Sequence, residues 1–254
     1  MILFNRFWLY FSSLSIVISF FLWVNNPDLT YYIAGYFFVI HTLTIWLLAK
    51  FGQERKTFFT FYFTPFFLLA GAFTFFLIID HVVVQHLFAL VIGIIYMLIT
   101  RNIFSFVYKT KDYQPLALEN IFSYINLISL FLFYSSFYGF LLLLGWPVWL
   151  FVIICFVITA FLFTRTLLTY KIQWTEGKLF VLIMSIIITE CFYVINLLPS
   201  SYIINGLVLV VVYYLFMNLI KDYLKERLNM KDIRLYLSVV GIILVISLLT
   251  TRWY

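Results

Sequence analysis

The chain has 254 residues, of which 65% are hydrophobic and only 10% charged, with a formal net charge of +6 and a mean hydropathy of +1.10. A soluble domain of this length needs much more polar surface, so composition excludes the soluble classes of enzyme and binding protein. The apolar residues form continuous runs and not the short alternating segments of a β-barrel, which predicts an all-α, polytopic helical membrane protein.

Nine runs are long enough to cross a bilayer, which takes about 20 apolar residues. In chain order, these predicted transmembrane helices cover 7–24, 29–49, 57–79, 84–105, 116–144, 148–168, 179–198, 202–220 and 235–251. The connections pair the first eight helices into four helical hairpins, which leaves one C-terminal helix. No long hydrophilic segment separates the runs, so residues 1–254 are predicted to form a single integral-membrane bundle without a soluble domain.

The basic residues orient these helices. Of the sixteen Lys and Arg residues, all but Arg252 fall on one side of the predicted spans. The positive-inside rule places that side, with the N-terminus, in the cytoplasm. The predicted partners are therefore the lipid bilayer and anionic lipid head groups at the cytoplasmic loops, and not nucleic acid. The oligomeric state stays open. The abundance of Phe and Tyr, which have AT-rich codons, favours the cytoplasmic membrane of a microbe.

An acid inside an apolar run is the first candidate for a functional site. In the stretch KLFVLIMSIIITECFYVINLLP, Glu190 falls near the middle of the predicted span 179–198. A charged group there costs about 2.5–3.5 kcal/mol on insertion scales. Tyr193 and Asn196 follow Thr189 at helical spacing, so a broad polar face is expected to point into the bundle. An acid on such a face is typical of a site for a proton, a cation or an amine. The alternative is a protonated carboxyl that donates a hydrogen bond to a neighbouring helix.

Two further polar residues lie deep in predicted spans. His41 has a depth within about one helical turn of Glu190, so the two side chains would meet if their helices were neighbours. The alternative is a hydrogen-bonded core histidine. Asn126 lies deep in the span 116–144 and is expected to bond to another helix. We therefore take Glu190, His41, Asn126, Tyr193 and Asn196 as candidates for binding a substrate or proton.

At the cytoplasmic face, Glu119 follows Pro115 in the first turn or so of its predicted helix. It would serve either as an interfacial cap or, with Arg101 and Arg165 on phosphate, as an acid or base acting on a lipid-linked substrate. The chain contains no Walker loop, HExxH, GxSxG or paired Asp motif, and no motif of a known family. An enzyme is therefore the less favoured class, and no catalytic residue is assigned.

Two local patterns predict structure and not chemistry. The stretch DHVVVQH places Asp80, His81 and His86 together, but two His residues five apart do not share a helix face, so a polar turn is predicted, with no metal site and no cofactor. Ala89 and Gly93 form a small-xxx-small step, which predicts close helix packing.

Three functions remain open. The favoured one is a binding or translocation protein for a small solute or lipid, with an intramembrane polar site around Glu190. The first alternative is a structural or partner subunit of a membrane complex without a site of its own. The second is the membrane-embedded enzyme with Glu119, Arg101 and Arg165 at the cytoplasmic face.

Overall fold

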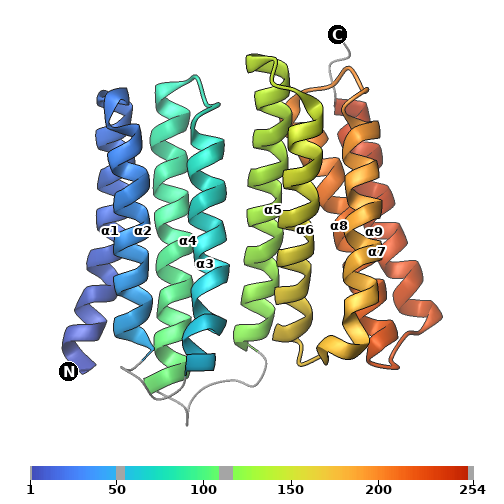
Figure 1. Ribbon diagram of the computed structural model, residues 1–254, viewed down its shortest axis with the longest axis horizontal. Helices are drawn as coiled ribbons and strands as arrows, with labels where there is room; N and C mark the ends of the chain where they lie inside the picture. Colours follow the sequence, from blue (N-terminus) through green and yellow to red (C-terminus); the bar gives the residue numbers. More distant parts are fainter. Residues whose placement is uncertain (1, 50–54, 109–116, 251–254) are drawn as a thin grey trace. The chain divides into compact units, whose positions relative to one another are not determined.

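The computed structural model describes residues 2–49, 55–108 and 117–250 (Figure 1). Within these ranges the chain folds into nine α-helices and one short 3-10 helix, η1 (Pro27–Leu29), with no strand. The α-helices are α1 (Ile2–Asn25), α2 (Thr30–Leu48), α3 (Arg55–Phe76), α4 (Val82–Tyr108), α5 (Ala117–Leu144), α6 (Val148–Thr169), α7 (Trp174–Ile195), α8 (Tyr202–Leu224) and α9 (Met230–Thr250).

Seven helices among the described residues are long and apolar enough to cross a membrane. They are α1, the continuous η1–α2 segment, α4, α5, α6, α7 and α8. A shorter apolar stretch, Phe61–Phe76, lies in α3. The prediction of an all-α multi-pass membrane protein is confirmed, whereas the count of nine spans and their pairing into hairpins stay predictions.

The chain divides into two compact units, with a boundary inside α5. Unit 1 is Met1–Ile125 and unit 2 is Asn126–Tyr254. The single bundle predicted from the sequence stays a prediction. In unit 2, the connections 145–147 and 196–201 carry no Lys or Arg, and we call this the neutral end. The connections 170–173 and 225–229 are basic, and we call this the basic end.

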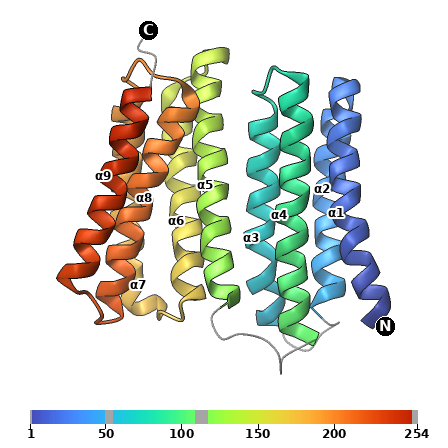
Figure 2. The ribbon, with the colours of Figure 1, turned by 180° about the vertical axis from the view of Figure 1, so that it is seen from behind.

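Unit 1 is built on a close contact between α1 and α4, its most extensive helix pair. Gly93 makes that approach possible, because a Cβ atom there would collide with the Val17 side chain and lie 3.7 Å from the Ser13 carbonyl oxygen. The close packing predicted from Ala89 and Gly93 is therefore confirmed. α2 packs against α1, α3 and α4 (Figure 2).

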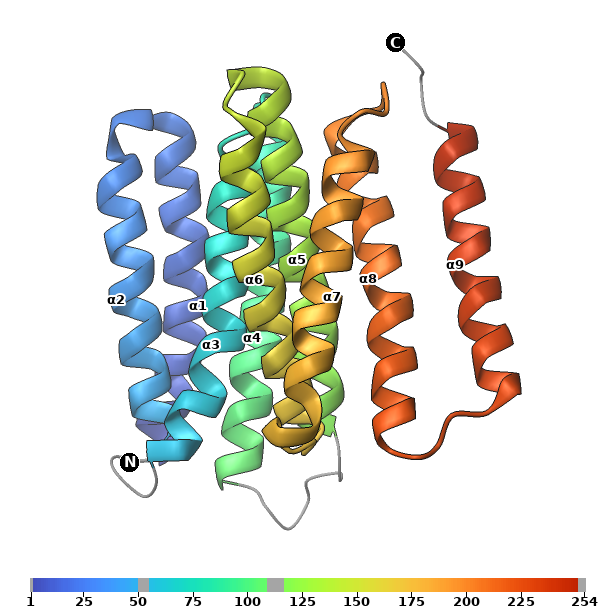
Figure 3. The same cartoon turned by 45° about the vertical axis from the view of Figure 1, so that its right-hand side comes forward.

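Unit 2 has α5 as its most buried helix, since every residue from 132 to 139 is buried. α8 approaches α5 through Gly206, where a Cβ atom would lie 2.8 Å from the backbone nitrogen of Ser135. α7 packs against α6 and α8, and α9 lies beside α8 (Figure 3). A side chain larger than hydrogen at Gly206 would have to push the two helices apart.

Two helices of unit 2 end at the basic end in the same way. After α6, Lys171 adopts a left-handed conformation with φ of 62°, and the Ile172 amide donates to the Leu167 carbonyl. After α8, Glu226 has φ of 52°, and the Arg227 amide donates to the Asp222 carbonyl. Both are Schellman motifs, which satisfy the last carbonyls of a helix and turn the chain sharply.

Candidate functional site

His41 on α2 is the polar centre of unit 1 and is fully buried. Its Nε2 lies 3.0 Å from the Tyr62 carbonyl oxygen, and its Nδ1 lies 3.2 Å from the Tyr96 hydroxyl. A carbonyl can only accept, so Nε2 carries the proton and Nδ1 accepts from Tyr96. Both ring nitrogens thus have hydrogen-bond partners inside unit 1.

The histidine supports a weak turn of α3. Pro65 lies inside that helix, and a proline lacks the amide hydrogen and crowds the preceding turn. Tyr62 is three residues before it, so His41 bonds a carbonyl in the turn that proline disturbs. Trp8 of α1 adds a bond from its ring nitrogen to Thr44, 3.2 Å away on α2. These contacts favour the core alternative for His41.

Asn126 is the polar residue that begins unit 2, and it is 1% exposed. Its side-chain nitrogen donates to the Thr166 hydroxyl on α6 at 3.1 Å, and that hydroxyl donates to the Leu162 carbonyl at 2.9 Å. The predicted bond from Asn126 to another helix is therefore present. Only one half of the amide is used, because the oxygen Oδ1 is buried without a hydrogen-bond partner.

Two buried hydroxyls of unit 2 also lack a hydrogen bond. They are the hydroxyls of Ser135 on α5 and Tyr213 on α8, and both residues are fully buried. Tyr213 lies near Thr166, but its hydroxyl does not reach hydrogen-bond geometry. An unsatisfied buried polar group costs about 1–3 kcal/mol, so these two hydroxyls and the Asn126 amide oxygen make the interior of unit 2 unusual. We call Asn126, Thr166 and Tyr213 the interior cluster.

Other buried hydroxyls of unit 2 are satisfied. Tyr134 of α5 meets the Thr159 hydroxyl of α6 at 2.7 Å, and that hydroxyl donates to the Cys155 carbonyl at 2.6 Å. Tyr138, also on α5, donates to the Phe192 carbonyl of α7 at 3.0 Å. Among the described buried hydroxyls of unit 2, the missing bonds are therefore confined to Ser135 and Tyr213.

Glu190 does not point into its unit. The residue is exposed on α7, in line with Ile186 and Tyr193, which are 43% and 54% exposed. The expectation of an inward polar face is therefore wrong for Glu190 and Tyr193. The depth changes too, because α7 begins at Trp174 and ends at Ile195. At about 1.5 Å per residue, Glu190 lies about 8 Å from the neutral end of the helix and about 24 Å from its start.

The composition of the buried side of α7 explains why the sequence placed Glu190 and Tyr193 on the wrong face. Val181, Met184, Ser185, Ile188 and Phe192 form the buried side of α7. Thr189 is half-buried, and its hydroxyl donates to the Ser185 carbonyl of its own helix at 2.7 Å. Apolar residues occur on every side of α7, so periodicity does not distinguish the face toward the protein from the face toward lipid.

Asn196 lies at the C-terminal end of α7, beyond Glu190, and is half-buried. It helps to line a cleft of about 290 Å³ at the neutral end of unit 2. The cleft is formed by the ends of α5 and α7, the starts of α6 and α8, and their two connections. Its lining residues are Tyr138, Leu141, Leu142, Gly145, Trp146, Val148, Asn196, Leu198, Ser200, Tyr202 and Asn205.

The three residues predicted for the cytoplasmic face divide between the units. Arg101 is exposed on α4 and Glu119 is half-buried in the first turn of α5, both in unit 1. Arg165 is half-buried on α6 of unit 2. Because no observation gathers them at one reacting position, the enzyme stays an alternative prediction.

The basic end of unit 2 carries two lysines over one aromatic ring. The ammonium groups of Lys221 and Lys225 lie 5.1 and 4.7 Å from the centre of the Tyr170 ring. Burial, with help from the nearby charges of Lys221 and Arg227, lowers the pKa of Lys225. Contact of the basic connections with anionic lipid head groups stays a prediction.

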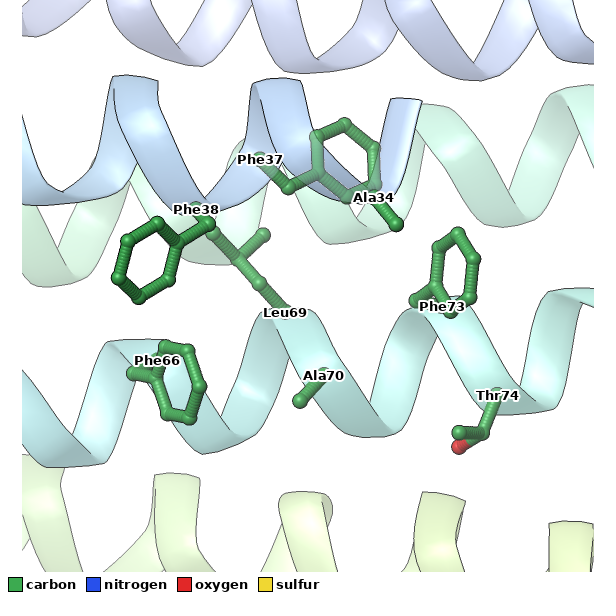
Figure 4. Close-up of a pocket in the computed structure, with 8 residues that line it drawn as sticks. All are labelled: Ala34, Phe37, Phe38, Phe66, Leu69, Ala70, Phe73 and Thr74. Carbon is green, nitrogen blue, oxygen red and sulfur yellow. The ribbon is translucent and has the colours of Figure 1, made fainter. Parts of the chain in front are cut away.

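Two remaining features each have a polar side chain that bonds a carbonyl of its own helix. His86 points its Nδ1 to the Val82 carbonyl of its own helix at 2.8 Å and packs its ring on Phe21. Figure 4 shows a pocket of about 310 Å³ between α2 and α3, lined by apolar side chains and Thr74. The Thr74 hydroxyl donates to the Gly71 carbonyl at 2.9 Å, which leaves an apolar surface of the kind that lipid chains cover.

Sequence reasoning missed Tyr213, Thr166 and Ser135 of the interior, and Trp146 and Asn205 of the cleft. Single hydroxyls and one Asn inside apolar runs give little signal, because such groups usually bond their own helix. Trp146 fits a membrane-interface residue equally well. The one available signal was Asn205, a costly amide near the start of an apolar run.

Comparison with known proteins gave no family: no family model, no curated protein and no solved structure matches this chain. The class is therefore set by the chain's own fold. It is a multi-pass membrane protein of apolar helices that lie in a lipid bilayer.

Proposed function

We propose that the protein binds, and moves across the membrane, a small solute or a lipid, and that the polar site lies in the interior cluster of unit 2. This keeps the function favoured by the sequence and transfers its site from Glu190 to Asn126 and its neighbours. The single observation that carries the proposal is that two buried polar atoms of the interior cluster, Asn126 Oδ1 and the Tyr213 hydroxyl, have no hydrogen-bond partner.

The physical argument starts from the cost of those atoms. Each costs about 1–3 kcal/mol when nothing bonds it, and an apolar bilayer offers no replacement partner. A polar ligand that donates to Asn126 Oδ1 and accepts from Tyr213 would remove that cost on binding. The interior cluster comes from α5, α6 and α8, so its ligand would contact three helices of one unit.

The test is a thermal-stability screen of the protein in phosphatidylcholine nanodiscs. The panel would contain amino acids, sugars, polyols, nucleosides and lipids. We expect at least one class to raise the unfolding temperature of the wild type, and Asn126→Leu and Tyr213→Phe to remove that rise. Tyr134→Phe is the matched control, because its hydroxyl already has a partner in Thr159. If no class gives a rise that Asn126→Leu and Tyr213→Phe remove and Tyr134→Phe keeps, the interior cluster is excluded as the site.

A second function is favoured by the exposed carboxylate of Glu190. A charge on an apolar helix face is expensive in lipid, and a cationic side chain on another membrane helix would relieve that expense. The protein would then be a subunit of a membrane complex, joined through α7. Photo-cross-linking from position 186, next to Glu190 on the exposed face, tests this: a specific cross-linked protein supports it, and cross-links to lipid alone contradict it.

A further inference from the structure

The cleft at the neutral end of unit 2 has the dimensions of a small ligand site. Its volume of about 290 Å³ is near the lower bound of about 300 Å³ for small-molecule pockets. It is separate from the interior cluster. Tyr138, which lines the cleft, is twelve residues beyond Asn126 on α5, and this spacing corresponds to about 18 Å along the helix.

The cleft offers hydrogen-bonding groups that the protein itself leaves partly unused. The Ser200 hydroxyl donates to Asn205 Oδ1, so the Asn205 amide nitrogen remains available, although the residue is only 5% exposed. Asn196 makes no side-chain hydrogen bond among the described residues. Tyr138 uses its proton on the Phe192 carbonyl, which leaves its oxygen able to accept. Donors and acceptors are therefore both present.

None of the eleven lining residues is acidic or basic. A ligand with a formal charge would give up hydration here without meeting an opposite charge, which disfavours binding. Neutral amides and hydroxyls instead match neutral hydroxyl groups, which both donate and accept. The lining thus selects for an uncharged ligand with several hydroxyls.

The Trp146 ring, which forms an aromatic wall of the cleft, sets the shape of the ligand. The Trp146 ring stacks on Phe140 and Phe151, with ring centres 5.8 and 5.9 Å away. These contacts hold an indole that is 50% exposed beside the amides of Asn196 and Asn205. A rigid aromatic surface next to polar groups suits a ligand that has C–H bonds on one face and hydroxyls at its edge.

We propose that this cleft binds an uncharged polyhydroxylated ring, such as a monosaccharide or an inositol, either free or as the head group of a lipid. The inference goes beyond the proposed function, because the cleft is a second site in the same unit. The hydroxyls bond Asn196, Asn205 and Tyr138, and the ring face lies on Trp146.

The experiment uses the full chain in phosphatidylcholine nanodiscs, prepared by polymer extraction so that no sugar detergent competes. The probes are methyl β-D-glucopyranoside and myo-inositol, followed by saturation-transfer NMR. We expect at least one of them to bind with a Kd of about 1 mM, typical of a few neutral contacts. Glucose 6-phosphate and glucosamine should bind at least about 10-fold more weakly, because each carries a charge.

The variants test the named contacts. Asn205→Leu and Asn196→Leu should each weaken binding about 5- to 10-fold, as expected for one lost hydrogen bond. Asn25→Leu, at an exposed position of unit 1, is the matched control and should have no effect. If Asn205→Leu fails to fold, Trp146→Ala at the exposed wall and Asn196→Leu still decide the question.

Two comparisons complete the design. Nanodiscs that contain monoglucosyl diacylglycerol should suppress the NMR signal if the ring normally arrives on a lipid, and leave it unchanged if it arrives as a free solute. Asn126→Leu should leave the cleft's affinity intact. Absence of binding by both neutral probes, or equal affinity for the charged sugars, overturns this inference alone if the screen still shows a response that depends on Asn126. If neither the probe binding nor the Asn126-dependent rise in unfolding temperature is found, the proposed function is overturned as well.

Discussion

Tyr134 and Tyr213 form a matched pair that measures how much one buried hydroxyl contributes to the free energy of unfolding. Both side chains are fully buried in unit 2. The Tyr134 hydroxyl has a partner at 2.7 Å in Thr159, whereas the Tyr213 hydroxyl has none. Replacing either by Phe removes one oxygen and leaves the ring in place, so the two variants differ mainly in the hydrogen bond.

The expected effects have opposite signs. Tyr134→Phe loses a bond worth about 0.5–1.5 kcal/mol and leaves the Thr159 hydroxyl with one partner fewer. Tyr213→Phe removes a buried group that costs about 1–3 kcal/mol when unpaired. The first variant should therefore unfold at a lower temperature than the wild type, and the second at the same or a higher temperature. A difference of 1 kcal/mol corresponds to about 2–4 °C for a chain of this size.

The assay is thermal unfolding in ligand-free nanodiscs, monitored by circular dichroism. Unfolding of such a protein is commonly irreversible, so all variants need the same heating rate. Equal destabilisation by the two substitutions would show that Tyr213 has a partner in the folded protein. The proposed interior site would then lose one of the two unpaired atoms that support it.

Three further predictions concern packing, the unit 1 network and the basic end. Gly206→Ala should destabilise the protein by about 1–3 kcal/mol, because its new Cβ meets the Ser135 backbone. Gly35→Ala is the control and should be neutral or stabilising, because a Cβ atom there has nothing within 4 Å. Equal shifts of the unfolding temperature would contradict the close approach of α5 and α8. His41→Leu should cost about 1–3 kcal/mol, because it removes the two hydrogen bonds that His41 makes with the Tyr62 carbonyl and the Tyr96 hydroxyl. His86→Leu should change the unfolding temperature little. The lowered pKa of Lys225 means that its charged form is disfavoured in the folded state, so this penalty is present at low pH and disappears as pH rises through the pKa of an unfolded lysine. Mass-spectrometric mapping of amine acylation at mildly alkaline pH should therefore show Lys225 reacting faster than the exposed Lys231, and a slower reaction would contradict the shift.

The sequence was sufficient for the class and for much of the helix layout. Apolar runs between short polar connections have few alternatives in a bilayer, so predicted and observed helices overlap throughout the described residues. Close packing at Gly93 was also predictable, because small residues at helical spacing let backbones approach. The helix count in the membrane and the grouping of helices do not follow from local pattern.

The site was harder to predict because its information is in the packing. In soluble helices the polar face marks the surface, but in this chain both faces of α7 are apolar apart from a few residues. The sequence therefore could not place Glu190 on the exposed side. Asn126 was recognised, since an amide in an apolar run is costly, but its partner Thr166 is 40 residues away on another helix. Long-range pairs of this kind become visible only when the helices are assembled.

The most direct test of the central claim is native mass spectrometry of the protein extracted with its surrounding lipid and released from nanodiscs. If the interior cluster binds a polar molecule, wild type and Tyr134→Phe should carry an additional mass that Asn126→Leu lacks. If every additional mass found on the wild type is also found on Asn126→Leu, a ligand site at Asn126, Thr166 and Tyr213 is contradicted.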